Sequence, residues 1–184
     1  MAQNVDRDPI LEAYRLWNAS GWEDCAAGCT AVTSLMRVHQ MMTRRADQIL
    51  APVDLTFARY ELLVRLYFHT DALPLSQLGK QLQIHQTSIT SLVDRLEKQG
   101  LIERMPHPTD RRVTIAQMTP AGRALTGKAI NLLNAEFFRD LGLTGREAHA
   151  LVYLLMKMRR AWNDIDSAEG WEPFAAGLDS PLAD

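Results

Sequence analysis

Short polar side chains open the helix that the sequence predicts from about residue 86. No acid occurs in this run before Asp94, and its members can all form hydrogen bonds: His85, Gln86, Thr87, Ser88, Thr90 and Ser91. Amides and hydroxyls of this size can approach base edges in a DNA major groove. The amide N–H groups of a helix N-terminus also favour phosphate. A polar face that only meets solvent would look the same, so this helix alone leaves both interpretations open.

The next segment adds arginines at the tip of a predicted β-hairpin. Residues 101–105 and 113–119 read as strands, and the turn between them contains Asp110, Arg111 and Arg112. An arginine at such a tip can place its guanidinium in the narrow minor groove, where the potential is most negative. Asp110 is placed to hold the guanidinium of Arg112 by a bidentate contact. An ordinary hairpin with a charged, solvated turn is the alternative.

Helices on both sides must position this segment. Apolar spacing and end signals predict helices over residues 9–18, 22–50, 56–69, 120–140 and 144–164, and two short helices within 75–99. Asp8, Thr56 and Thr144 are the expected N-terminal caps, and Gly100 is the expected end of the second short helix. Residues 71–74 form a connector with room for one small strand. The fold class is therefore mainly α, a winged helix-turn-helix with flanking helices and a two-stranded β-wing.

Composition and charge are compatible with this interpretation. The chain has 184 residues, 47% hydrophobic and 23% charged, which is a globular balance. Its net charge is −2, but residues 161–184 hold six acids and no Lys or Arg, so residues 1–160 carry a net +4. The overall charge therefore does not exclude a nucleic-acid partner. Because no apolar run approaches the roughly 20 residues of a membrane span, and no signal peptide opens the chain, we expect a cytoplasmic protein without membrane contact.

Residues 75–125 resemble the winged-helix core of the MarR (multiple antibiotic resistance regulator) family. The matching motifs are Leu-x-x-Leu-Gly at 75–79, Val-Asp-Arg-Leu-Glu-Lys-x-Gly-Leu-Ile-x-Arg at 93–104, Asp-Arg-Arg at 110–112 and Thr-Pro-x-Gly-Arg at 119–123. Weaker similarity extends over residues 28–162. The extra N-terminal helix resembles that of only some members, including the urate-responsive branch. That branch carries an arginine where this chain has Leu92, which argues against urate as the ligand.

The resemblance implies a homodimer that regulates transcription, usually as a repressor, by binding a pseudo-palindromic operator in double-stranded DNA. The implied dimer interface combines the first long helix with the last two. Their surplus of apolar side chains agrees, because so small a core cannot cover all of them: Leu132, Leu133, Phe137, Phe138, Leu151, Val152, Leu154, Leu155 and Met158. With Asp110 organising the wing, the residues expected to contact DNA are Gln86, Thr87, Ser88, Thr90, Ser91, Arg95, Arg111 and Arg112.

The resemblance also implies a small effector, commonly an aromatic anion, that binds between the dimer helices and the winged helix and releases the DNA. A cation would pair with its carboxylate and aromatic rings would stack on it. Tyr60 can instead be core, and Arg104 can instead make a phosphate contact or a salt bridge. The candidate effector residues by position are Trp17, His39, Tyr60, Glu61, Arg65 and Arg104.

Two alternatives for the function remain. Cys25 and Cys29, four residues apart on one helix face, would suit a redox-responsive regulator of the same fold, although no basic residue nearby lowers a thiol pKa and packing explains them as well. The fold can also serve as a protein-interaction module without DNA binding. The five histidines show no ligand spacing, and catalytic motifs are missing, so we expect no enzyme, metal or cofactor.

The sequence divides into five parts along its length. The acidic last part is expected to be mobile or loosely docked, with Trp171 and Phe174 as its possible anchors. The parts are an extra helix (1–21), a dimerisation helix (22–55), the winged helix-turn-helix (56–119), the C-terminal dimerisation helices (120–164) and the tail (165–184).

Overall fold

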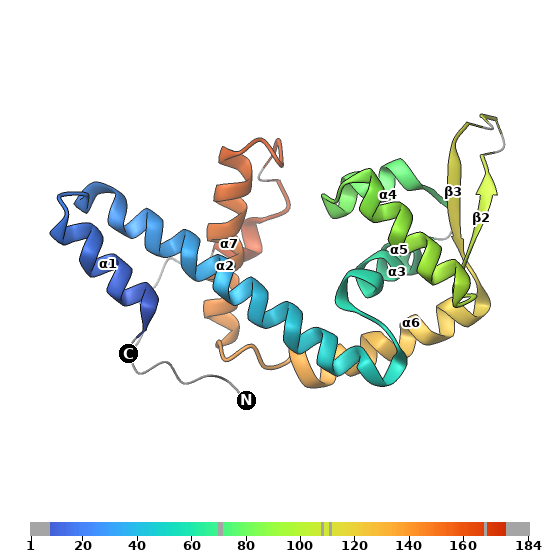
Figure 1. Ribbon diagram of the computed structural model, residues 1–184, viewed down its shortest axis with the longest axis horizontal. Coiled ribbons are helices and arrows are strands. Elements are labelled where there is room, and N and C mark those ends of the chain that lie inside the picture. The colour runs from blue at the N-terminus through green and yellow to red at the C-terminus, as the bar shows by residue number, and fades with distance from the viewer. Residues whose placement is uncertain (1–7, 70–71, 108, 111, 168, 176–184) are drawn as a thin grey trace. The chain divides into compact units, whose positions relative to one another are not determined.

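Helices and one small antiparallel sheet build the chain (Figure 1). The computed structural model describes residues 8–69, 72–107, 109–110, 112–167 and 169–175, apart from the side chain of Gln86. Arg111 lies outside these residues. The chain divides into two units, residues 1–137 and 138–184. Among the described residues, no helix is both long and apolar enough to cross a membrane.

Three helices open the first unit, and local signals set their ends. Helix α1 (Pro9–Ala19) begins where the Asp8 carboxylate accepts the N–H of Ile10 at 3.0 Å. Helix α2 (Glu23–Leu50) runs into the short 3₁₀ turn η1 (Ala51–Val53), and α3 (Phe57–Phe68) follows. The Thr56 hydroxyl caps α3 as expected, because it accepts the N–H of Arg59. These ends agree with the sequence prediction to within one residue.

The winged helix-turn-helix follows in the same unit. Helices α4 (Leu75–Leu82) and α5 (Gln86–Lys98) are separated by a turn in which Gln83 adopts a left-handed φ of 52°. Strands β2 (Ile102–Pro106) and β3 (Thr114–Met118) form the predicted hairpin. The connector supplies a third strand, β1 (Leu73–Pro74), which pairs with β3 so that the sheet order is β1-β3-β2. The winged-helix fold class is confirmed, with this additional strand.

A single apolar core holds these elements together. Leu62, Leu63 and Leu66 place α3 at its centre, and all three are at most 2% exposed. The core also takes residues from the flanking helices, including Leu50 at the C-terminal end of α2 and Leu133 at the end of the helix after the wing. Burial of this apolar surface is the main stabilising contribution, at about 25 cal/mol per Å². The winged helix is therefore anchored directly on α2.

Helix α6 (Pro120–Leu133) is shorter than the single helix predicted over 120–140. Thr119 caps α6, since its hydroxyl accepts the N–H of Gly122 at 3.0 Å. After Leu133 the chain passes into a π-helical turn, η2 (Asn134–Phe138), whose turns are wider than those of an α-helix. Phe137 remains buried in that turn. The apolar period alone did not reveal the change of helix type.

The second unit contains α7 (Gly145–Ala161) and the short α8 (Glu172–Ala175). Thr144 and Glu147 form a reciprocal capping box at the start of α7. Two aromatic residues dock the described part of the tail onto α7: the Phe174 ring lies 5.2 Å from that of His149, and the Arg159 guanidinium lies 5.7 Å from the Trp171 ring. The expected anchors thus make contacts, while residues 176–184 lie outside the described residues.

Candidate nucleic-acid interface

Helix α5 has one buried face and one open face. Ile89, Val93 and Leu96 are fully buried in the core, which orients the helix. The opposite face is exposed, and it holds most of the residues that the sequence predicts for DNA contacts: Thr87, Ser88, Thr90, Ser91 and Arg95. The helical period explains this division, because residues three or four apart share a face. The core thus presents the small polar side chains to solvent along one line.

The N-terminal end of α5 is open to an anion. Its cap is His85, whose Nδ1 accepts the N–H of Thr87 at 3.4 Å and lies 3.0 Å from the Thr87 hydroxyl. No acidic residue lies in the first turn, so no carboxylate offsets the positive end of the helix dipole. Such an end attracts phosphate.

Asp110 holds Arg112 at the tip of the wing. The Asp110 carboxylate accepts the backbone N–H of Arg112 at 3.1 Å, and it accepts two guanidinium N–H groups at 3.1 and 3.3 Å. These hydrogen bonds keep the pKa of the Asp110 carboxyl below its usual range. The Arg112 side chain is nevertheless 91% exposed. The guanidinium is therefore oriented while remaining accessible to a partner.

Arg104 ties the base of the wing to α5. Its Nη1 donates to Glu97 at 2.7 Å, and its Nη2 donates to Asp94 and to the carbonyl of Thr90. The backbone N–H of Arg104 also donates to Glu97, at 3.1 Å. The structure thus places Arg104 in the salt bridge that the sequence left as its alternative role. The N–H groups of the Arg104 guanidinium donate to residues of α5, and none of these partners is an effector candidate.

Three effector candidates share one electrostatic environment on α2 and α3. Loss of solvent around the carboxyl group of Glu61 raises its pKa, although the residue as a whole remains at the surface. The charges of Arg65 and His39 partly offset that rise. His39 also lines an open groove along α2 together with Arg44 and Asp47. A carboxylate of raised pKa with two basic neighbours is a suitable environment for a polar ligand.

The remaining candidates lie elsewhere. Tyr60 is 6% exposed and stacks on Phe57, with the ring centroids 5.8 Å apart, so it belongs to the core. Trp17 meets Trp22 edge-on at 5.5 Å, at the corner between α1 and α2. His39 lies about 25 Å further along α2 at 1.5 Å per residue. Within one chain the structure therefore groups three of the six candidates.

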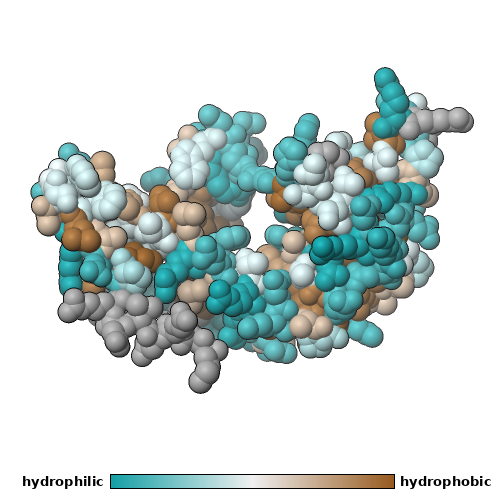
Figure 2. All heavy atoms as spheres, viewed as in Figure 1, coloured by the Kyte–Doolittle hydropathy of each residue, from teal (hydrophilic) through white to brown (hydrophobic). Residues whose placement is uncertain are grey.

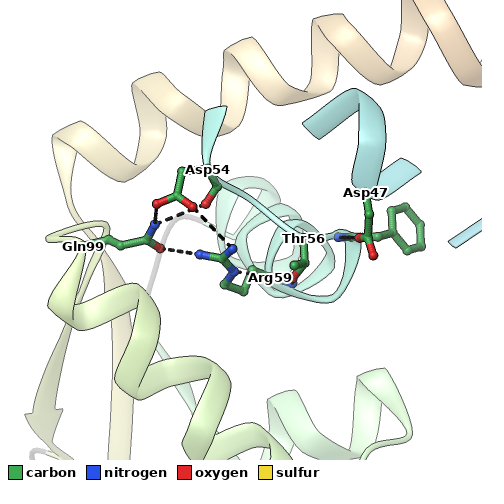
Figure 3. A network of polar contacts seen from close by, with 6 residues as sticks. Asp47, Asp54, Thr56, Arg59 and Gln99 are labelled. Carbon is green, nitrogen blue, oxygen red and sulfur yellow. Dashed lines mark hydrogen bonds and ion pairs between the residues drawn. The ribbon is translucent and has the colours of Figure 1, made fainter. Parts of the chain in front are cut away.

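A polar network that sequence reasoning missed joins α2, α3 and the end of α5 (Figure 3). Its members are Asp47, Asp54, Thr56, Arg59 and Gln99. Gln99 occupies the unspecified position of the Val-Asp-Arg-Leu-Glu-Lys-x-Gly motif. No periodic signal marks the two contacts of Gln99, since they join it to positions 40 and 45 residues away.

Helices α1 and α2 carry many exposed apolar side chains, which lie among polar ones in Figure 2. In the whole of α2 only Ala26, Ala46 and Leu50 are buried. Large exposed side chains on the two helices include Leu11, Leu16, Val32, Met36 and Met41. In the second unit Leu151 and Leu154 are exposed as well.

Two residues of the predicted apolar surface have a different place. Leu133 is fully buried and Phe137 is 4% exposed, because both pack into the core of the first unit. They are therefore not available to a partner.

The cysteines of α2 are free thiols, with Cys25 exposed and Cys29 partly buried. The described residues contain no group of three potential metal-ligating side chains.

Comparisons with known proteins agree on one family. Residues 55–114 match the sequence model of a family described as the MarR family. The multiple antibiotic resistance protein MarR of Escherichia coli is 30% identical over 123 residues, which are 66% of this chain and 85% of that protein.

Two solved structures are similar in fold and sequence. Sco5413, a MarR family transcriptional regulator from Streptomyces coelicolor, superposes with a TM-score of 0.70 at 36% identity, covering 77% of this chain and 99% of that one. The transcriptional repressor CouR, from Rhodococcus jostii RHA1, bound to a 23-mer DNA duplex, has a TM-score of 0.64 at 27% identity, covering 69% of this chain and 90% of that one.

Proposed function

Because the chain belongs to the MarR family of transcriptional regulators, we propose that it is a repressor that binds a pseudo-palindromic operator as a homodimer. The observation that carries this proposal is the exposed polar face of α5, followed by a wing whose tip holds an oriented arginine. A repressor of similar fold and sequence, CouR, is known in complex with a DNA duplex.

In this proposal α5 enters the major groove. Thr87, Ser88, Thr90 and Ser91 lie at or near its open end, where hydroxyls can meet base edges or phosphates. Gln86 begins the helix, and Arg95 on the same exposed face has the charge for a phosphate contact. Arg112 enters the adjacent minor groove, where the electrostatic potential favours a guanidinium. Arg111, one residue earlier, adds charge to the same contact.

The dimer is proposed from the apolar surfaces. Exposed apolar side chains as numerous as those of α1 and α2 are expected to be covered by a partner. A second copy of the chain is the simplest partner, since a two-fold axis covers the same surface on both. Two recognition helices would then lie about 34 Å apart, one turn of DNA. Light scattering that finds a monomer at micromolar concentration would contradict this step.

Effector control is proposed to act through His39, Glu61 and Arg65. The two basic residues can pair with the carboxylate of an aromatic acid, and the Glu61 carboxylate can accept a hydrogen bond from a hydroxyl of the ligand. Tyr60 precedes Glu61 in α3, and its side chain is buried in the apolar core, so it is not assigned a direct contact with the ligand. Arg104 and Trp17 are assigned to the wing base and the α1–α2 corner, where their contacts lie. Stabilisation of the protein by benzoate in a thermal-shift assay, lost in R65A, would support this assignment.

Selection from a randomised duplex library tests DNA recognition directly. The purified protein should enrich an inverted repeat whose half-sites lie about one helical turn apart. R112A should reduce binding to enriched and random DNA alike, since its proposed contact is to charge and groove shape. If no sequence is enriched and binding stays unmeasurable at low salt, the protein-interaction alternative takes the place of this function.

A further inference from the structure

The side chain of Gln99, the residue that caps the C-terminal end of α5, ties that end of the helix to the junction between α2 and α3 (Figure 3). Its Nε2 donates to the carbonyl of Asp54 at 3.2 Å and to the Asp54 carboxylate at 2.8 Å. Its Oε1 accepts from Nη1 of Arg59 at 3.0 Å. Both ends of the amide are therefore used, and neither contact survives if donor and acceptor are exchanged.

The junction that receives Gln99 is itself held by polar contacts. Asp54 ends η1 in the left-handed region, with φ of 51°. The Arg59 side chain is only 12% exposed, its Nη2 lies 3.8 Å from the Asp54 carboxylate, and its Nε donates to the Thr56 hydroxyl at 3.4 Å. Asp47, in the last turns of α2, accepts the N–H of Phe57 at 2.7 Å. Gln99, Asp54, Arg59 and Thr56 are thus linked through their side chains, and the Asp47–Phe57 contact adjoins them through the backbone between Thr56 and Phe57.

These bonds do something that the apolar contacts of α5 cannot do. Ile89, Val93 and Leu96 hold the helix to the core by burial, which is not directional and tolerates small rotations. Hydrogen bonds with defined donors and acceptors select one arrangement, and breaking the Gln99 bond removes one of the three partners of a largely buried guanidinium. Arg59 is the largely buried member of this network, whereas the Asp54 side chain is 85% exposed. The best-attested role of a buried polar group is to set register.

From this geometry we propose that Gln99 is a positioning residue that fixes the orientation of α5 on the α2–α3 junction, and thereby the operator half-site spacing that the dimer accepts. The inference rests on the proposed function. Helix α5 has 13 residues and is about 20 Å long, so a tilt at its Gln99 end moves the DNA-facing end through the whole length of the helix. Loss of the bridge should broaden the range of spacings bound.

The test uses the whole 184-residue chain and the duplex enriched from the randomised library, with zero, one or two base pairs added between the half-sites. Each added pair moves the half-sites apart by about 3.4 Å and rotates them by about 35°. Q99E keeps an oxygen that can accept the hydrogen bond from Arg59. It replaces the Nε2 donor by a carboxylate oxygen, however, so that two carboxylates, those of residues 99 and 54, repel each other. D54N supplies a donor in return, so Q99E combined with D54N restores a complementary pair. Q48E adds the same charge at an exposed position of α2 and is the control.

We expect the wild-type protein and Q48E to bind the duplex with one added pair about tenfold more weakly than the original. For Q99E, the ratio of the affinity for the original duplex to that for the duplex with one added pair should fall to about three. Adding D54N should return this ratio towards ten. If Q99E does not fold, Q99M removes the hydrogen bonds without adding charge and should relax the ratio in the same way. All ratios are measured well below the Tm of each variant.

Three results would overturn the inference. An unchanged ratio in folded Q99E or Q99M means that the bridge does not set spacing. An equal loss of affinity for every spacing, following a fall in Tm, means that Gln99 only stabilises the fold. If D54N fails to restore the ratio in the Q99E background, the Gln99–Asp54 contact is not the cause. Failure to enrich any DNA is a separate outcome, which removes the proposed function and this inference together.

Discussion

Gly122 lies directly against the backbone of Leu101. A Cβ on Gly122 would stand 2.9 Å from the Leu101 carbonyl carbon and closer still to its oxygen. Thr119 reinforces this approach, because its N–H donates to the same carbonyl at 3.1 Å and its hydroxyl donates to the carbonyl of Gly100 at 2.7 Å. The first turn of α6 is thereby joined to the residues between α5 and the wing.

G122A should therefore destabilise the protein. The neighbouring atoms belong to the backbone and cannot move aside easily, so we expect the free energy of unfolding to fall by about 1–3 kcal/mol or more. G127A is the matched control on the same helix, where the nearest atom is the Tyr67 hydroxyl at 3.9 Å. It should leave stability unchanged or raise it by about 0.5–1 kcal/mol. Urea unfolding of both variants measures the difference, and equal stabilities would refute the steric argument.

R112A should weaken binding to operator and non-specific DNA alike. If the lost contact is ionic, each removed charge lowers the slope of log Kd against log salt by about 1, hence by about 2 for a dimer. Fluorescence anisotropy across a salt series measures this slope. An unchanged slope would place Arg112 away from the phosphates and the groove.

D110A distinguishes positioning from simple electrostatics. Removal of an acid beside DNA should tighten binding if only charge matters. Because Asp110 holds the Arg112 guanidinium by two hydrogen bonds, we expect D110A to weaken binding, although less than R112A does. D110N, which removes the charge and keeps one acceptor, should fall between wild type and D110A. Tighter binding by D110A in the same assay would exclude the organising role.

S88A should lose affinity selectively for the operator. Ser88 lies exposed in the first turn of α5, and a hydroxyl that contacts a base edge contributes about 1–3 kcal/mol of discrimination. Binding to random duplex should stay within error of wild type. S20A, at the exposed end of α1, provides a serine control far along the chain. Equal losses on both duplexes would reassign Ser88 to a phosphate contact.

E61Q should change the pH dependence of stability. The pKa of Glu61 is raised in the folded protein, chiefly by loss of solvent, so the wild-type fold loses stability as the pH rises from the unfolded-state pKa through the folded one. The glutamine has no such titration. The Tm difference between E61Q and wild type should therefore be more positive at pH 7 than at pH 4. E136Q measures the effect of removing an exposed carboxylate, and parallel pH profiles for E61Q and wild type would contradict the assignment.

Local chemistry made many elements predictable from the sequence. Asp8, Thr56, Thr119 and Thr144 cap helices through atoms two or three residues away, so short segments are enough to locate those ends. The polar face of α5 follows from the helical period that buries Val93 and Leu96. The Asp110–Arg112 contact spans two residues and was foreseeable for the same reason.

The partners of long-range polar groups depended on the tertiary structure. Arg104 had two open roles until the fold brought β2 beside Asp94 and Glu97 of α5. Tyr60 became core only because α3 is surrounded on several sides, and the π-helical turn after Leu133 has no periodic signature.

The sequence by itself determined most of the helices and the wing strands, the caps Asp8, Thr56 and Thr144, and the exposed polar face, because these depend on residues within about one helical turn of each other. The tertiary structure alone decided the Gln99 bridge and the approach of Gly122 to Leu101. Gln99 meets residues 40 and 45 positions away, and Gly122 meets one 21 positions away. Such contacts depend on how the shared core orients whole elements, and no local pattern along the chain carries that information.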